Sequence, residues 1–221
     1  MKKLLFALLA FMPMVGLAQN VWEVPENTST KKEEVKKVEK KKSKPVKAED
    51  AKYLAGAVPV VDGHVVFTLD KDVPGMSADE IYNRMYVFID SLTREENQFD
   101  VSKIAAVNKT EHTIAARFKE WLVFQSSFLS LDRTEFNYTL ISRCSDGHVT
   151  LTLERISYQY EMDRGDNSGL QTSADDWITD KYALNKKGTK LARYSGKFRR
   201  KTIDRKDNIF SRACEALGVQ Y

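Results

Sequence analysis

The sequence predicts an α+β domain, in which an antiparallel sheet carries packed helices and an extra helical segment follows at the C-terminus. A helix-start motif at Ser77–Glu80 precedes apolar residues at three- and four-residue spacing. Residues 102–160 then alternate apolar and polar side chains in four segments joined by short turns, which is typical of an antiparallel meander with one buried face. The last forty residues return to helical spacing and reach a stop signal at Gly218.

The first elements follow from local signals. Val58–Leu69 is rich in β-branched and aromatic residues and contains the turn dipeptide Asp62-Gly63. We expect one strand here, or a short hairpin that leads into a strand at His64–Leu69. In the capping box Ser77–Glu80 both side chains can satisfy open backbone donors, so a helix should run from there to about Thr93.

Four consecutive strands should follow this helix. We expect them at Ser102–Asn108, Ile114–Phe124, Phe136–Leu140 and Val149–Tyr160. The apolar positions change parity after Glu154. A one-residue slip would turn every later side chain to the other face, so the sequence predicts a β-bulge near Glu154–Ile156.

Two helices are expected in the tail. Ser173 can cap the first, which should run to about Leu184 with Asp175 and Asp176 near its positive end. The second should span about Asp204–Leu217. We therefore divide the folded part into a sheet domain at 53–162 and a helical extension at 163–221 that packs on the same domain.

Charge divides the chain into blocks. Residues 31–52 hold ten lysines, five acidic residues and only three valines, too few apolar groups to offset the entropy of ordering. We expect residues 19–52 to be a disordered tether, acting as a spacer or attracted to an anionic surface. Acidic residues outnumber basic ones 21 to 11 between 53 and 180, whereas 181–221 hold 12 basic and 3 acidic residues. The C-terminal segment should therefore lie against the acidic body.

The N-terminus has the three parts of a secretory signal peptide. Met1-Lys2-Lys3 precedes an apolar run from Leu4 to Val15 and the small-residue ending Gly16-Leu17-Ala18. We expect cleavage after Ala18 and a periplasmic or secreted product, which makes ATP, NAD and chromosomal DNA improbable partners. No cysteine follows Ala18 to carry a lipid, and no later stretch is apolar for long enough to form a transmembrane segment.

Catalytic motifs are missing from the sequence. His64, His112 and His148 each lie beside a turn rather than at ligand spacing, so we expect no metal, no cofactor and no catalytic residue. Cys144 and Cys214 form an even pair in an exported chain. They either form a disulfide or remain as free core thiols.

Binding candidates are aromatic and basic. Trp121 has the parity of Arg117 and Lys119, so it should lie on the sheet face opposite the first helix. There Trp121 would pack under the tail or offer a ligand platform. Trp177 is the second aromatic candidate, and Lys197, Arg199 and Arg200 are the candidates for an anionic ligand.

Several short stretches resemble a bacterial family of domains of unknown function with a TBP-like fold, of the DUF4468 type. They lie at Val65–Phe67, Val73–Tyr82, Glu120–Phe124, Phe136–Thr139, Trp177–Lys186 and Gly196–Asp204. The resemblance covers nearly all of Tyr53–Leu217 and implies the order β-α-β-β-β-β-α. It implies no chemistry, because the family has no catalytic or binding residues to carry over.

Three classes of function stay open. The first is a non-catalytic envelope module that binds a protein partner, a glycan or another anionic ligand through its sheet face or basic tail. A secreted inhibitor or structural partner and a hydrolytic enzyme with a dispersed site are the alternatives. Nucleic acid is not expected, because the fold name carries no function and a single acidic copy lacks a duplicated basic saddle.

Overall fold

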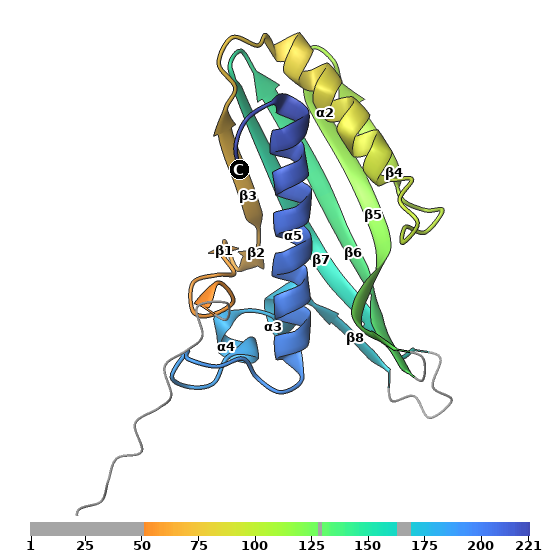
Figure 1. Cartoon of the computed structure of the whole chain (residues 1–221), viewed down its shortest axis with the longest axis vertical. Coiled ribbons are helices and arrows are strands. Elements are labelled where there is room, and N and C mark those ends of the chain that lie inside the picture. The colour runs from red at the N-terminus through yellow and green to blue at the C-terminus, as the bar shows by residue number, and fades with distance from the viewer. Residues whose placement is uncertain (1–50, 128–129, 163–168) are drawn as a thin grey trace, which may run out of the picture. The chain divides into compact units, whose positions relative to one another are not determined.

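The computed structural model describes residues 51–127, 130–162 and 169–221. The predicted leader and nearly all of the predicted tether lie outside these ranges. An antiparallel six-stranded sheet forms the centre of the domain, and the two long helices α2 (Ala78–Leu92) and α5 (Ser195–Leu217) lie on one of its faces (Figure 1). Within the described ranges, no helix has the length and apolar character needed to span a bilayer.

The sheet has the predicted meander at its heart. Its strands are β3 (Phe67–Asp72), β4 (Lys103–Asn108), β5 (Thr113–Ser127), β6 (Ser130–Ser145), β7 (His148–Tyr160) and β8 (Leu170–Ser173). Across the sheet the order is β3-β7-β6-β5-β4, and β8 pairs with the far end of β7. The hairpin β1 (Val60–Val61) and β2 (His64–Val65) precedes β3, so the α+β order β-α-β-β-β-β-α is confirmed.

Helix α2 begins where the capping box predicted. The Ser77 hydroxyl accepts a hydrogen bond from the Glu80 backbone N–H at 3.3 Å. The Glu80 carboxylate instead accepts from the Arg84 guanidinium one turn later, at 3.0 Å. The helix buries Ile81, Met85 and three further apolar residues against the sheet, as the spacing required.

The predicted β-bulge is confirmed. Asn137 pairs with Ser157 and Thr139 pairs with Glu154, so β7 has one residue more than β6 between these pairs. Arg155 lies there with a φ of 54°, a left-handed conformation. The bulge restores the inward direction of the apolar side chains that follow it.

The first tail helix was predicted wrongly in its length. Ser173 caps a helix as expected, but that helix is the four-residue α3 (Ala174–Trp177), and α4 (Asp180–Ala183) starts again after Thr179. The break leaves the Ile178 carbonyl free to accept a hydrogen bond from the Arg199 guanidinium at 2.8 Å. Strand β8, just before the cap, was not predicted at all.

The terminal helix begins nine residues earlier than predicted, at Ser195 rather than Asp204. Gly196 does not interrupt it. A Cβ atom on Gly196 would lie 2.8 Å from the Leu191 Cβ, so the glycine lets the preceding loop approach the first turn. Gly218, at a φ of 73°, ends the helix as expected.

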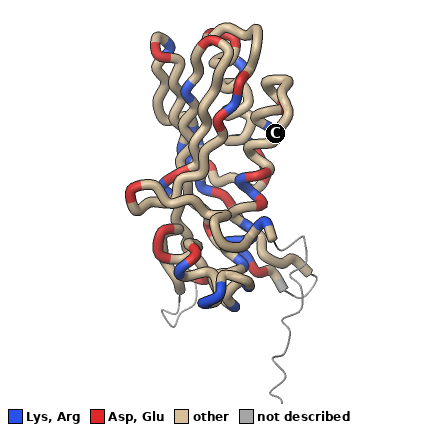
Figure 2. Tube along the Cα trace, turned by 90° about the vertical axis from the view of Figure 1, so that its left-hand side faces the viewer, with Lys and Arg blue, Asp and Glu red and all other residues tan. Residues whose placement is uncertain are grey.

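Helix α5 lies against the acidic body, as the charge blocks predicted. Arg205 donates to both carboxylate oxygens of the fully buried Glu120 at 2.7 Å and to Glu95 at 2.6 Å. Burial alone would raise the pKa of Glu95, but its hydrogen bonds to Arg212 and Arg205 lower it overall. Acidic and basic positions therefore interleave over the body of the domain (Figure 2).

Candidate functional site: the open face of the sheet

One face of the sheet is not covered by any helix of the described residues. Helices α2 and α5 both pack on the other face, where β5 buries Ile114, Phe118 and Leu122. We call the opposite side, formed by the outward side chains of β4, β5, β6 and β7, the open face. Trp121 lies on it between the inward residues Glu120 and Leu122, which confirms the predicted direction of its side chain.

The open face is rich in cations. Its basic residues are Lys103, Arg117, Lys119, Arg133, Arg143 and Arg155. Glu135 and Glu154 are the acidic residues among them, and Asp70 and Asp72 lie on β3 at the sheet edge. The acidic excess over residues 53–180 therefore does not describe this face, because that count combined residues from both sides of the sheet.

Half of these cations have partners. Lys119 forms an ion pair with Glu135 at 2.9 Å, and the Arg155 guanidinium lies 3.6 Å from Glu154. The Arg133 guanidinium covers the Trp121 ring at 3.7 Å from its centroid.

The other three cations find no partner in the described part of the chain. Over the described ranges, the side chains of Lys103, Arg117 and Arg143 make no hydrogen bond, ion pair or ring contact. Lys103 is also the direct cross-strand partner of Arg117. Two like charges are thus held side by side, an arrangement that destabilises a sheet.

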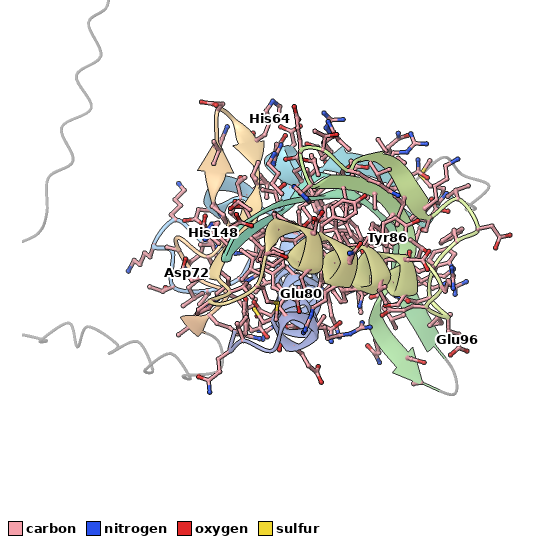
Figure 3. All side chains as sticks on the ribbon, turned by 90° about the horizontal axis from the view of Figure 1, so that it is seen from above. His64, Asp72, Glu80, Tyr86, Glu96 and His148 are labelled. Carbon is pink, nitrogen blue, oxygen red and sulfur yellow. The ribbon has the colours of Figure 1, made fainter. Side chains whose placement is uncertain are left out.

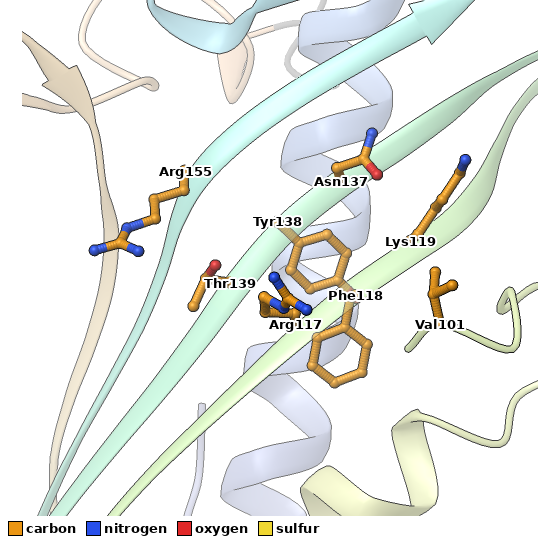
Figure 4. A pocket seen from close by; sticks show the side chains of 8 residues that line it. All are labelled: Val101, Arg117, Phe118, Lys119, Asn137, Tyr138, Thr139 and Arg155. Atoms are coloured by element: carbon orange, nitrogen blue, oxygen red, sulfur yellow. The ribbon is translucent and has the colours of Figure 1, made fainter. Parts of the chain in front are cut away.

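A shallow hollow of about 290 Å³ surrounds Arg117. Lys119, Asn137, Thr139 and Arg155 line it, and Arg155 joins because of the bulge in β7. Figure 4 views the open face, with Arg117 between the β6 side chains and Lys119 while α5 lies behind the strands. The hollow offers cationic, amide and hydroxyl groups to solvent, and Val101, Phe118 and Tyr138 add apolar and aromatic surface to its lining.

The two tryptophans are not brought together. The prediction that the basic tail covers Trp121 is wrong, because α5 packs on the opposite face; Phe99 is a neighbour instead, at 5.0 Å between ring centroids. Trp177 packs edge-on against Phe198 of α5 at 6.0 Å. Only Trp121 belongs to the open face.

Arg199 cannot be a ligand contact, which corrects its place among the anionic-ligand candidates. Its side chain is 0% exposed. The guanidinium donates to the carbonyls of Tyr53 and Leu54 at 2.6 Å each, to that of Ile178 at 2.8 Å and to the Asp180 carboxylate at 2.7 Å. This arginine holds the start of the domain and the α3–α4 break to α5.

Lys197 and Arg200 are also engaged within the domain. The Lys197 ammonium donates to the Asp132 carboxylate at 2.8 Å and to the Tyr160 hydroxyl at 3.0 Å. The Arg200 guanidinium lies 4.3 Å from the Tyr53 ring centroid. The three basic tail candidates therefore do not form one free anion-binding cluster.

Both cysteines are free and buried, so the disulfide that the sequence left open is not formed. Burial raises the pKa of the Cys144 thiol and of the Cys214 thiol. Raised thiol pKa values keep both residues protonated and poorly nucleophilic near neutral pH.

Each histidine contacts an aspartate from another element. The pairs are His64–Asp175 at 2.9 Å, His112–Asp79 at 2.8 Å and His148–Asp72 at 3.1 Å. Figure 3 shows His148 beside Asp72, with His64 at another part of the domain. The Asp72 contact raises the pKa of His148. In the described ranges, no three His, Cys, Asp or Glu side chains gather in a way that would hold a metal ion.

A second cavity, of about 630 Å³, lies beside the β1–β2 hairpin. His64, Glu154, Arg155 and Asp175 are among its lining residues. Asp175 also accepts from the Val65 backbone N–H at 2.6 Å, so its carboxylate holds the hairpin to α3. His64 and Asp175, which face this cavity, are thus engaged with each other.

Comparisons with known proteins agree with this architecture. A family model described as a domain of unknown function (DUF4468) with TBP-like fold matches residues 67–159. A crystal structure of a DUF4468 family protein from Bacteroides ovatus is 43% identical with a TM-score of 0.70, over 77% of this chain and 95% of that one. A TBP-like protein from Parabacteroides distasonis is 22% identical with a TM-score of 0.60, over 74% and 99% of the two chains. No functionally curated protein matches the chain.

Proposed function

The chain belongs to the DUF4468 family of domains with a TBP-like fold, and we propose that it is an exported, non-catalytic module that binds its partner on the open face of the sheet. The leader at 1–18 supports export to the periplasm or beyond. The lysine-rich segment at 31–52 suits a tether that lets the domain reach a partner at a distance.

The observation that carries the proposal is a sheet face that is lined with cations and that no described helix covers. Two long helices protect one face, while the other presents Trp121 and three basic side chains that have no partner among the described residues. A face that served only to cover the core would gain stability from paired charges. A cluster of cations on a rigid sheet would complement the charge of an anionic partner.

The chemistry of the described residues supports a non-catalytic role. The two thiols have raised pKa values, and each histidine contacts an aspartate from another element. General acid–base or nucleophilic catalysis needs such groups to converge on a space where a substrate can bind. The hollow around Arg117 contains neither histidine nor cysteine.

Lysine labelling tests the proposal without changing the protein. Lysines are acetylated in the intact native envelope and in the purified protein, and the extent of labelling at each site is measured by mass spectrometry. We expect Lys103, on the open face, to be protected in the envelope. Lys187, exposed in the loop between α4 and α5, is the matched control and should react equally in both samples. Equal labelling of Lys103 in both samples would contradict the proposal.

A further inference from the structure

We infer that the ligand of the open face is an acidic glycan, a polysaccharide with repeated carboxylate, phosphate or sulfate groups. This inference rests on the proposed function and names the ligand class of the same surface. The central contact is between one anionic group of the polymer and the neighbouring side chains of Lys103 and Arg117.

Lys103 and Arg117 are direct cross-strand partners and carry the same charge. Directly opposite residues in an antiparallel pair have Cβ atoms roughly 5 Å apart, so the two charges repel each other. An anion between them would offset this repulsion and would accept hydrogen bonds from both the Lys103 ammonium and the Arg117 guanidinium. The two side chains are thus arranged for a ligand that the domain does not supply from its own described residues.

The neighbours of this pair fit a sugar polymer rather than a single small anion. Lys119 is the next outward residue along β5, roughly 6.6 Å from Arg117 along the strand. The Asn137 amide and the Thr139 hydroxyl lie beside them on β6 and line the same hollow. The Lys103–Arg117 pair, with amide and hydroxyl groups next to it, suits an anionic group that is carried on hydroxyl-bearing rings.

Nucleic acid fits this face less well. Proteins that bind single strands offer several aromatic rings on which successive bases stack. Trp121 is the only Phe, Tyr or Trp among the described outward residues of β4–β7, and Arg133 covers its ring. The described outward residues of β4–β7 therefore lack a series of aromatic rings for successive bases, although the charge of this face would attract any polyanion.

The test compares charge reversal on the open face with a matched reversal elsewhere. The chain from residue 19 onward is used, with Lys36, Lys37, Lys40, Lys41, Lys42 and Lys44 changed to glutamine in every variant so that the tether does not dominate binding. Affinity is measured for heparin, polygalacturonate, uncharged dextran, single-stranded DNA and duplex DNA. The open-face variant is K103E/R117E. The control K186E/K187E changes the net charge equally, at two exposed lysines between α4 and α5.

We expect K103E/R117E to bind heparin and polygalacturonate at least about tenfold more weakly, and the control to stay within about twofold of the parent. Dextran should not bind. Equal losses in both variants would overturn the inference, because net charge alone would then explain binding. DNA binding that is tighter than glycan binding and lost only in K103E/R117E would replace the glycan with nucleic acid.

Two further readouts keep the result interpretable. The neutral variant K103Q should bind the acidic glycans more weakly and yet unfold at a higher urea concentration, because the repulsion from Arg117 is removed. A variant that merely folds badly cannot show both effects. If neither acidic glycan binds while Lys103 remains protected in the native envelope, the ligand class is wrong and the proposed binding face stands.

Discussion

Replacement of Arg199 by methionine should destabilise the domain strongly without changing any residue of the open face. The change removes the donors of three carbonyls, those of Tyr53, Leu54 and Ile178. Each carbonyl left without a donor costs about 1 kcal/mol at the low end of measured values. Asp180 adds little to this sum, because its side chain is 44% exposed and can return to water.

The expected loss is therefore about 3 kcal/mol in the free energy of unfolding. With a urea m-value of about 2 kcal/mol/M, the unfolding midpoint should fall by about 1.5 M. Hydrogen exchange should also become faster at residues 51–57, since Arg199 holds two carbonyls of that segment. The control is Arg193→Met at an exposed position, expected to change stability by less than about 0.5 kcal/mol. A loss for Arg199→Met no greater than that of the control would refute the assignment of a structural role.

Three further predictions concern single residues. The pKa of Glu95 in the folded state is lowered below 4.5, so the stabilisation from this carboxylate is present above about pH 4.5 and is lost as the pH falls through the folded-state pKa. The difference in urea unfolding midpoint between wild type and Glu95→Gln should therefore shrink on acidification. The pKa of His148 is raised above 6.5 by its hydrogen bond to Asp72, so the stabilisation from the charged imidazole is present below about pH 6.5 and is lost as the pH rises through the folded-state pKa. If the urea midpoints of wild type and His148→Gln still differed at about pH 9, this linkage would be wrong. Gly196→Ala should lower the thermal unfolding midpoint, because the new methyl group would meet Leu191 at 2.8 Å, and an unchanged midpoint would show that the loop yields freely.

The elements predicted well are those whose signals are local. The cap at Ser77 and the parity change after Glu154 both appear within a few residues of sequence, and both occur as expected. The α3–α4 break could not be predicted in this way. It depends on Arg199, which is 21 residues away from the Ile178 carbonyl that it binds. Strand β8 likewise has only four residues and is a strand because β7 offers it an edge to pair with.

The candidate site was predicted in part. The parity that placed Trp121 on the polar side also placed Arg117 and Lys119 there, so the open face was present in the sequence pattern. The neighbouring position of Lys103 depends on the register between β4 and β5, which includes an irregularity between Ile104 and Ala106. Alternation within one strand cannot reveal that register.

The basic tail candidates were misjudged for a related reason. A dense run of charge shows that cations are near one another in sequence, but not that carboxylates and carbonyls already surround them. Lys197 meets Asp132, and Arg199 is enclosed by backbone oxygens. Only the tertiary structure distinguishes a cation with an internal partner from one without.

The difference between cations with and without internal partners also explains why residues 53–180, in which acidic residues are in excess, present a basic face. Many of its acidic residues lie on α2, in the loop that follows it, or inward on the sheet, where Glu95, Glu120 and Asp132 neutralise the cations of α5. Their charge is therefore used inside the domain and does not offset the outward cations. Lys103 and Arg117 then stand opposite each other at a cost in stability. Substitution of either Lys103 or Arg117 by glutamine would remove that cost in stability. A role in binding would explain why the protein has two cations at these positions.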